Sequence, residues 1–122
     1  MQSLINFIGL TVFTTLLALG QLMFKQIGVG MRGQTLLDGF VTLFQQPLLY
    51  GALAIYGLAT LLWIWILSRV PLMQAYPWTA AGIVIVSLLG LVVFGERVGP
   101  LFWVGIGLIL AGLILTQYSA QV

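Results

Sequence analysis

Residues 72–94 read LMQAYPWTAAGIVIVSLLGLVVF, a run without one charged side chain. A helix needs about 20 apolar residues to cross the hydrocarbon core of a bilayer, so this run is long enough to span a membrane. Three runs of similar length and character lie at residues 4–24, 48–67 and 101–118. The sequence therefore predicts an all-α membrane protein with four transmembrane helices.

The composition supports this prediction and excludes several functions. Of the 122 residues, 61% are hydrophobic and 5% are charged, and the mean hydropathy is +1.19, well outside the range of soluble domains. The net charge of +2 rests on four cations against two acids, too few for a nucleic-acid-binding face. Because the chain has no Cys or His and no acidic cluster, we expect no disulfide, metal site, cofactor or catalytic residue.

The connections between the runs are mostly short, which favours antiparallel neighbours in an up-down-up-down bundle with both termini on one side. We expect the first run to be retained, because it lacks the positively charged start of a signal peptide. A single domain over 1–122 is predicted, with spanning helices at about 4–27, 47–68, 72–94 and 100–119 and a short interfacial helix at about 35–45.

Loop charges set a weak orientation. Lys25, Arg32 and Arg97 fall on one side of the predicted bundle, and Arg69 falls on the side of the termini. The positive-inside rule places the first and third connections in the cytoplasm. A three-to-one count leaves insertion in both orientations open.

Polar residues form a stripe on the first helix. At about 100° per residue, Thr11, Thr14, Gln21 and Lys25 project within about 80° of one another, and Ala18 completes the stripe. One interpretation is that these groups hydrogen-bond neighbouring helices. The other is that they line a hydrophilic pathway, in which Gln21 and Lys25 jointly hold a phosphate oxygen.

The third helix contains Pro77, which has no amide to donate to the carbonyl of Met73, so a kink is expected here. The kink either adjusts the packing angle or exposes a carbonyl to a ligand. Tyr76, Thr79 and Ser87 lie on one face of the same helix. Both interpretations of Pro77 stay open.

The fourth helix carries Gly105 and Gly112 seven residues apart, which is typical of a packing seam, because small residues let helix backbones approach closely. Whether the seam packs within the chain or across a dimer is open. Four short helices are too few to enclose a route for a sizeable substrate, which favours a dimer.

Glu96 and Arg97 are adjacent in the last connection. They are solvated there, or they cap the helix end, or Glu96 pairs with Lys25 on the same side of the membrane.

Three segments together resemble a known family. GQLMFKQ at 20–26, VPLMQAYP at 70–77, and GERV at 95–98 followed by the glycine-spaced 105–112 are similar to segments of the lipid A modification flippases. These are small subunits assigned to moving aminoarabinose-phosphoundecaprenol across the bacterial inner membrane, within the drug/metabolite transporter superfamily. The resemblance covers nearly the whole chain and implies a small multidrug resistance-like four-helix fold.

The related small multidrug resistance exporters depend on a membrane-embedded glutamate in helix one. Counted back from Gly20 and Lys25, that position is Leu17 here, and leucine binds neither a proton nor a cation. The departure counts against proton-coupled drug export. The clear Gly-x-Gly pattern of helix three in that family is also missing, with Gly82 as a partial substitute.

The leading hypothesis is a transporter: a flippase, or flippase subunit, for a polyprenyl-phosphate-linked sugar or similar anionic lipid in the bacterial inner membrane. The alternatives are a drug or metabolite exporter and a non-transporting accessory subunit. We expect membrane lipids, a lipid-linked substrate and a similar small subunit, either a copy or a different chain, as partners. Candidate substrate-binding residues are Lys25, Gln21, Thr14, Tyr76, Arg32, Arg69, Arg97 and Glu96.

Overall fold

The structure, a computed structural model, describes residues 2–119 and is helical at six places in this range. The helices are α1 (Gln2–Gly30), α2 (Leu36–Gln45), α3 (Pro47–Leu67), α4 (Leu72–Trp78), α5 (Ala80–Val93) and α6 (Pro100–Ser119). Four segments are long and apolar enough to cross a membrane: α1, α3, α4 together with α5, and α6. The predicted fold class, an all-α membrane protein with four spanning helices, is confirmed.

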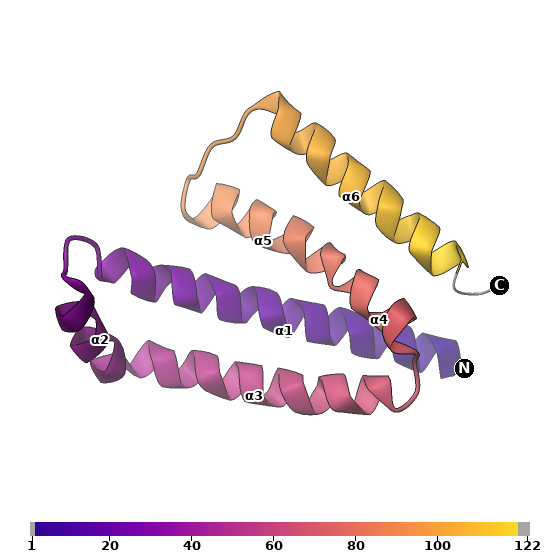
Figure 1. Ribbon diagram of the computed structural model, residues 1–122, viewed down its shortest axis with the longest axis horizontal. Helices are drawn as coiled ribbons and strands as arrows, with labels where there is room; N and C mark the ends of the chain where they lie inside the picture. Colours follow the sequence, from indigo (N-terminus) through magenta and orange to yellow (C-terminus); the bar gives the residue numbers. More distant parts are fainter. Residues whose placement is uncertain (1, 120–122) are drawn as a thin grey trace.

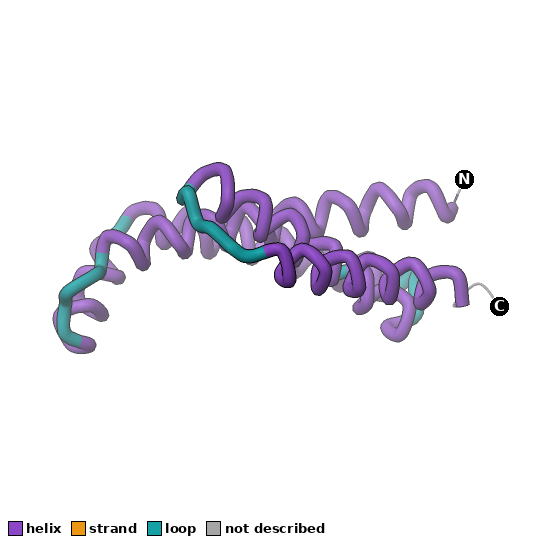
Figure 2. The backbone as a smooth tube through the Cα atoms, turned by 90° about the horizontal axis from the view of Figure 1, so that it is seen from above, coloured by secondary structure: helices purple, strands orange, loops and turns teal. Residues whose placement is uncertain are grey.

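The four spans lie side by side in the order α3, α1, α4/α5 and α6 (Figure 1). Helix α1 packs against both α3 and α5, whereas α6 lies at the outer edge against α4 and α5. The two ends of the chain lie at the same end of the molecule, and Figure 2 shows this from a second side. One face of α1 and one face of α5 therefore meet in the middle of the molecule.

The core lies mainly between α1 and α3. Ala52 and Ala59 are almost fully buried there, and their small side chains let the two helices approach closely. The ring of Phe13 stacks on Trp63 with centroids 4.6 Å apart. Large apolar side chains such as Leu61 and Leu108 instead point outward, as expected for residues that face lipid. The buried apolar residues are Leu10, Phe13, Ala18, Ile27, Leu49, Ala52, Ala59, Ile66, Val70, Ala75 and Ile106.

The first connection contains helix α2, which lies across the ends of α1 and α3 (Figure 1). Helix α1 runs on through Gly28 to Gly30, past the break expected near residue 27, and the chain turns at Gly33 with φ +84°. The Thr35 side chain caps α2 by accepting a hydrogen bond from the amide of Asp38 at 3.3 Å. Helix α2 exposes an apolar face of the kind that lies in a membrane interface, made of Leu36, Leu37, Phe40, Val41 and Phe44.

The third span is interrupted at Thr79, between α4 and α5, two residues after Pro77. The amide of Thr79 donates to the Tyr76 carbonyl at 3.0 Å, a tighter turn than the α-helical one. One turn earlier, the side-chain amide of Gln117 on α6 donates to the Gln74 carbonyl at 2.9 Å. The carbonyl that Pro77 leaves without an amide partner is that of Met73, so the bond from α6 reaches the next carbonyl along the chain and ties α6 to α4 close to the proline.

Candidate functional site

A cavity of about 200 Å³ lies between α1 and α5, at the end of the molecule remote from the termini. Its polar lining consists of Gln21 and Lys25 on α1 and Glu96 in the turn after α5. Sequence positions more than 70 residues apart therefore contribute to one site. The remaining lining residues are Ala18, Leu22, Val86, Leu89, Gly90 and Phe94.

An ion pair occupies this cavity. Lys25 Nζ lies 3.8 Å from Glu96 Oε2 and 6.0 Å from the centre of the Phe94 ring. The side chains keep 41% and 54% of their surface exposed, so the pair contributes little to stability, on the order of 0–1 kcal/mol. The alternative in which Glu96 pairs with Lys25 is confirmed, and both charges remain accessible to a ligand.

Two glycines place the Glu96 carboxylate. Gly95 has φ +65°, a conformation that other residues rarely adopt, and it turns the chain back toward α5. The Gly90 carbonyl accepts hydrogen bonds from the amides of Phe94 at 3.2 Å and Glu96 at 3.1 Å. The carboxylate itself lies where a side chain at Gly90 would be. Glu96 is therefore directed at the cavity by its backbone.

The Gln21 side chain is oriented from the other side. Its Nε2 donates to Tyr56 Oη of α3 at 2.6 Å, and the Tyr56 ring stacks on Phe24 with centroids 5.1 Å apart. The ring lies directly against the backbone of α1 at Gly20, where any side chain would overlap it. The carbonyl oxygen of Gln21 is left to accept from a ligand.

A second cavity of about 320 Å³ extends the site toward the middle of the spanning helices. It is lined by Leu17, Ala18, Gln21, Thr79, Gly82, Ile83 and Val86, and it shares Ala18, Gln21 and Val86 with the first cavity. We call the two together the α1/α5 groove. The groove runs from the Lys25–Glu96 pair to the break between α4 and α5, and its inner part carries no ionisable side chain.

Other candidate residues lie outside this groove. Thr14 is buried, and its hydroxyl donates to the Leu10 carbonyl at 2.7 Å within α1. This part of the polar stripe is therefore not accessible to a ligand. Arg69 lies at the end nearer the termini, its guanidinium 4.4 Å from the centre of the Trp65 ring. Tyr76 is mostly exposed and lies edge-on to Trp63.

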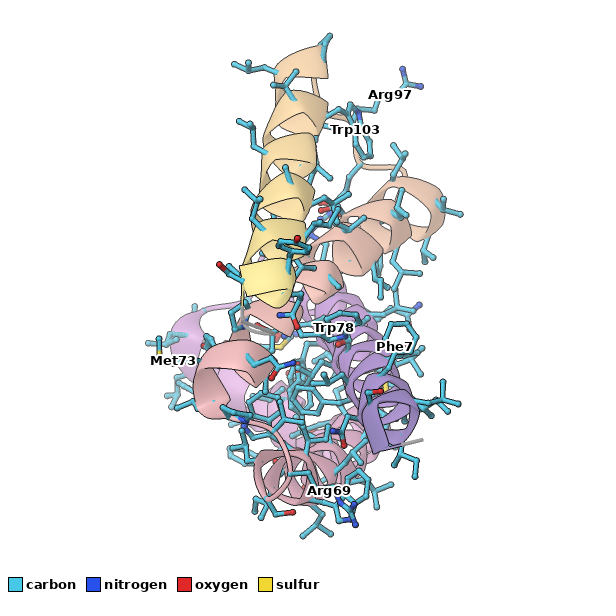
Figure 3. All side chains as sticks on the ribbon, turned by 90° about the vertical axis from the view of Figure 1, so that its right-hand side faces the viewer. Phe7, Arg69, Met73, Trp78, Arg97 and Trp103 are labelled. Carbon is cyan, nitrogen blue, oxygen red and sulfur yellow. The ribbon has the colours of Figure 1, made fainter. Side chains whose placement is uncertain are left out.

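The last two arginines lie toward the Lys25 end of the molecule. Arg32 is exposed in the turn after α1, and Figure 3 shows Arg97 projecting away from the helices. The structure thus brings together Lys25, Gln21 and Glu96. It does not bring Arg32, Arg97, Thr14, Tyr76 or Arg69 into that cavity.

The glycine seam of α6 is open. A side chain added at Gly105 or Gly112 would meet no atom of the described chain within 4 Å. Over residues 2–119 this seam therefore does not pack against another helix of the chain.

Sequence reasoning missed the contributions of Tyr56, Gly90 and Gln117. Tyr56 carries a hydroxyl in the middle of an apolar helix, which is a usable signal, since such a group needs a partner. Gly90 has no comparable signal, because its importance depends on where the Glu96 carboxylate folds back.

Comparison with known proteins places the chain among small membrane transporters. A model of the small multidrug resistance protein family matches residues 37–109. A probable 4-amino-4-deoxy-L-arabinose-phosphoundecaprenol flippase subunit ArnE from Proteus mirabilis is 31% identical over 114 residues, covering 93% of this chain and 98% of the relative. The protein of the same name from Pseudomonas savastanoi pv. phaseolicola is 36% identical over 98 residues, covering 80% of this chain and 84% of the relative. No solved structure matches the chain.

Proposed function

The chain belongs to the small multidrug resistance protein family, and within that family we propose that it is a flippase, or a flippase subunit, for a polyprenyl-phosphate-linked sugar. The observation that carries this proposal is the α1/α5 groove, with a cation and an amide at the level of a lipid headgroup and apolar walls further in. The relatives' names assign them a lipid-linked aminosugar, which is a substrate of this class.

The groove suits a lipid with a small polar headgroup. Lys25 supplies a point charge for the phosphate, and Gln21, already held by Tyr56, supplies a carbonyl for a sugar hydroxyl. Val86 and Ile83, on the opposite wall, remain partly exposed to the surroundings of the chain. The sugar phosphate would enter between α1 and α5 while the polyprenyl tail stays among the lipid chains.

The absence of an acid from the spans favours this function over proton-coupled export of cations. A coupled exporter usually needs an ionisable group at membrane depth. Leu17 lines the groove at the depth where such a group would act, and both acids of the chain, Asp38 and Glu96, lie outside the four apolar runs.

We further propose that a second four-helix subunit, a copy or a similar chain, packs on the Gly105–Gly112 face of α6 in the bacterial inner membrane. The open seam and the position of α6 at the edge of the molecule support this, and the relatives are named as subunits. Small residues are the typical contact surface between helices in lipid.

The test is binding of a short-chain polyprenyl-phosphate sugar to the purified protein, followed by native mass spectrometry. Lys25→Met keeps the apolar stem and removes the charge, so we expect about tenfold weaker binding or more. Arg32→Met, which removes an exposed cation outside the groove, is the matched control and should bind like the unaltered protein. Equal binding by Lys25→Met, or retention of bulk phospholipid alone, would contradict the proposal and favour an exporter.

A further inference from the structure

Helix α2 presents three different surfaces around its axis. At about 100° per residue, its exposed apolar side chains cover an arc of about 140°, made of Leu36, Leu37, Phe40, Val41 and Phe44. A second arc is polar and consists of Asp38, Thr42 and Gln45. The third arc contains the buried Gly39 together with Leu43. Each arc therefore needs surroundings of its own: one apolar, one aqueous and one provided by the protein.

The protein surrounds the third arc and attaches α2 on two sides. The Met31 side chain, in the turn after α1, packs against Gly39: a methyl group there would lie 3.1 Å from the terminal carbon of Met31. At the other end of α2, the Tyr50 hydroxyl of α3 donates to the Phe44 carbonyl at 2.8 Å. These two contacts fix the direction in which the apolar arc points relative to the spans.

The packing of α1 on α3 gives the level at which α2 is attached. Close contacts at three glycines mark the positions that face each other: Gly9 with Trp65 and Ile66, Gly20 with Tyr56, and Gly51 with Met23. Because the two helices are antiparallel and rise equally per residue, Lys25 lies level with residues 49–51. Tyr50 therefore ties α2 to the spans at the level of Lys25.

The length of α3 places this level at the border of the hydrocarbon core. Helix α3 has 21 residues and is about 31 Å long, which matches a core about 30 Å thick. Only Gln46 separates α2 from α3, so α2 lies at one border of this core. The apolar arc of α2 thus continues the lipid-facing surface of the spans, and acyl chains are the apolar surroundings within its reach.

We propose that α2 is a membrane-surface anchor, with its apolar arc among the acyl chains of one leaflet and its polar arc in water. Through Tyr50 the anchor sets the depth of the charged end of the α1/α5 groove. Lys25, about one helical turn inside the border, extends its ammonium to the phosphates of that leaflet. The inference concerns depth in the membrane and holds whatever the groove transports.

The test measures the surroundings of α2 by electron paramagnetic resonance, with the full chain in vesicles of phosphatidylethanolamine and phosphatidylglycerol. The chain has no cysteine, so single spin labels can be placed on it. Leu37→Cys and Val41→Cys label the apolar arc, and Asp38→Cys and Gln45→Cys label the polar arc. We expect the first two labels to collide mainly with oxygen, about 5–10 Å deep, and the other two mainly with a water-soluble nickel complex.

Two further labels calibrate the measurement. Leu61→Cys reports the lipid limit, because Leu61 is exposed on α3 away from both ends of the helix. Arg32→Cys, in the exposed turn after α1, reports the water limit.

The outcomes distinguish the possible surroundings of the apolar arc. Access of the nickel complex to both Leu37→Cys and Val41→Cys would place this arc in water and overturn the proposal. Labels at these positions that neither reagent reaches would mean that a second copy or another protein covers the arc, which overturns it as well. Oxygen access on the apolar arc together with nickel access on the polar arc establishes the anchor.

The attachment through Tyr50 has a separate readout. The distance between labels at Val41→Cys and Leu61→Cys is measured with and without Tyr50→Phe, which removes the bond to the Phe44 carbonyl. We expect a broader distance distribution in Tyr50→Phe, because one end of α2 is released. Tyr118→Phe removes an exposed hydroxyl on α6 and should leave the distribution unchanged. Equal widths in Tyr50→Phe and the unaltered protein would overturn the role of Tyr50 in setting the depth of the groove.

Discussion

At the scale of single residues, the contact between Gly20 and Tyr56 links the packing of α1 and α3 to the site. The Tyr56 ring lies against the α1 backbone because Gly20 has no side chain, and from there its hydroxyl accepts from Gln21. The same ring stacks on Phe24. The lack of a side chain at Gly20 thus allows the Tyr56 side chain to contact the α1 backbone, Gln21 and Phe24 together.

We predict that Gly20→Ala lowers the thermal midpoint of the protein in detergent. Overpacking costs about 1–3 kcal/mol, whereas the gain in helix propensity is at most about 1 kcal/mol, so the loss dominates. Gly28→Ala is the matched control, because Gly28 lies on the same helix and a methyl group there meets no described atom within 4 Å. It should leave the midpoint unchanged or raise it.

A double-mutant cycle makes this prediction specific. In a Tyr56→Ala background the methyl group of Gly20→Ala has no ring to displace, so the substitution should no longer destabilise the protein. Equal effects of Gly20→Ala with and without the Tyr56 ring would show that the close contact does not limit packing here.

The site was only partly predictable from residue patterns. Lys25 and Gln21 stand one helical turn apart, so their common face followed from the sequence. The pairing of Lys25 with Glu96 was one of two open alternatives, because it depends on how α5 packs against α1. Thr14 fits the same stripe but bonds its own helix, which spacing alone does not reveal.

At the scale of the elements, length and the absence of charge were enough to predict the four spans, because a bilayer leaves few other structures for such runs. The exact course of the third span was not predictable in this way. Pro77 indicated a kink, but the full interruption at Thr79 and the bond from Gln117 to the Gln74 carbonyl depend on the neighbouring α6.

We predict that Pro77→Ala joins α4 and α5 into one straighter helix. The chain has no cysteine, so spin labels can be placed at the exposed positions Met73 and Leu91 through Met73→Cys and Leu91→Cys. A continuous helix separates two Cα atoms 18 residues apart by about 27 Å. Electron paramagnetic resonance should show a distance that moves toward this value and a narrower distribution.

Pro71→Ala is the control for this measurement, because Pro71 precedes α4 and does not interrupt it. It should leave the label distance unchanged. The same distance in Pro77→Ala and the unaltered protein would mean that packing against α1 and α6, rather than the missing amide, sets the break.

At the scale of the whole molecule, the spans form an open row rather than an enclosed bundle, with α6 at its edge (Figure 1). Helix α6 buries only Ile106 among its described residues, and the span of α4 and α5 buries only Ala75. An open row offers a lipid headgroup a groove but no closed path. A partner on the free side of α6 would extend this row to more than four spans.

The glycines of α6 allow this assembly to be tested. Gly105 and Gly112 share one helix face, whereas Gly107 lies about 160° around the helix from Gly105. A side chain at any of the three meets no atom of the described residues within 4 Å. Gly112→Leu should therefore leave the fold of the single chain intact but lower the partnered fraction about tenfold or more, since it holds two backbones apart. Gly107→Leu adds the same bulk to the other face and should leave the partnered fraction unchanged.

The masses of complexes released gently from the native membrane measure both fractions and identify the partner as a copy or a similar small chain. Equal partnered fractions in Gly112→Leu and Gly107→Leu would exclude the Gly105–Gly112 face as the contact, and a single-chain mass for the unaltered protein would exclude the assembly itself.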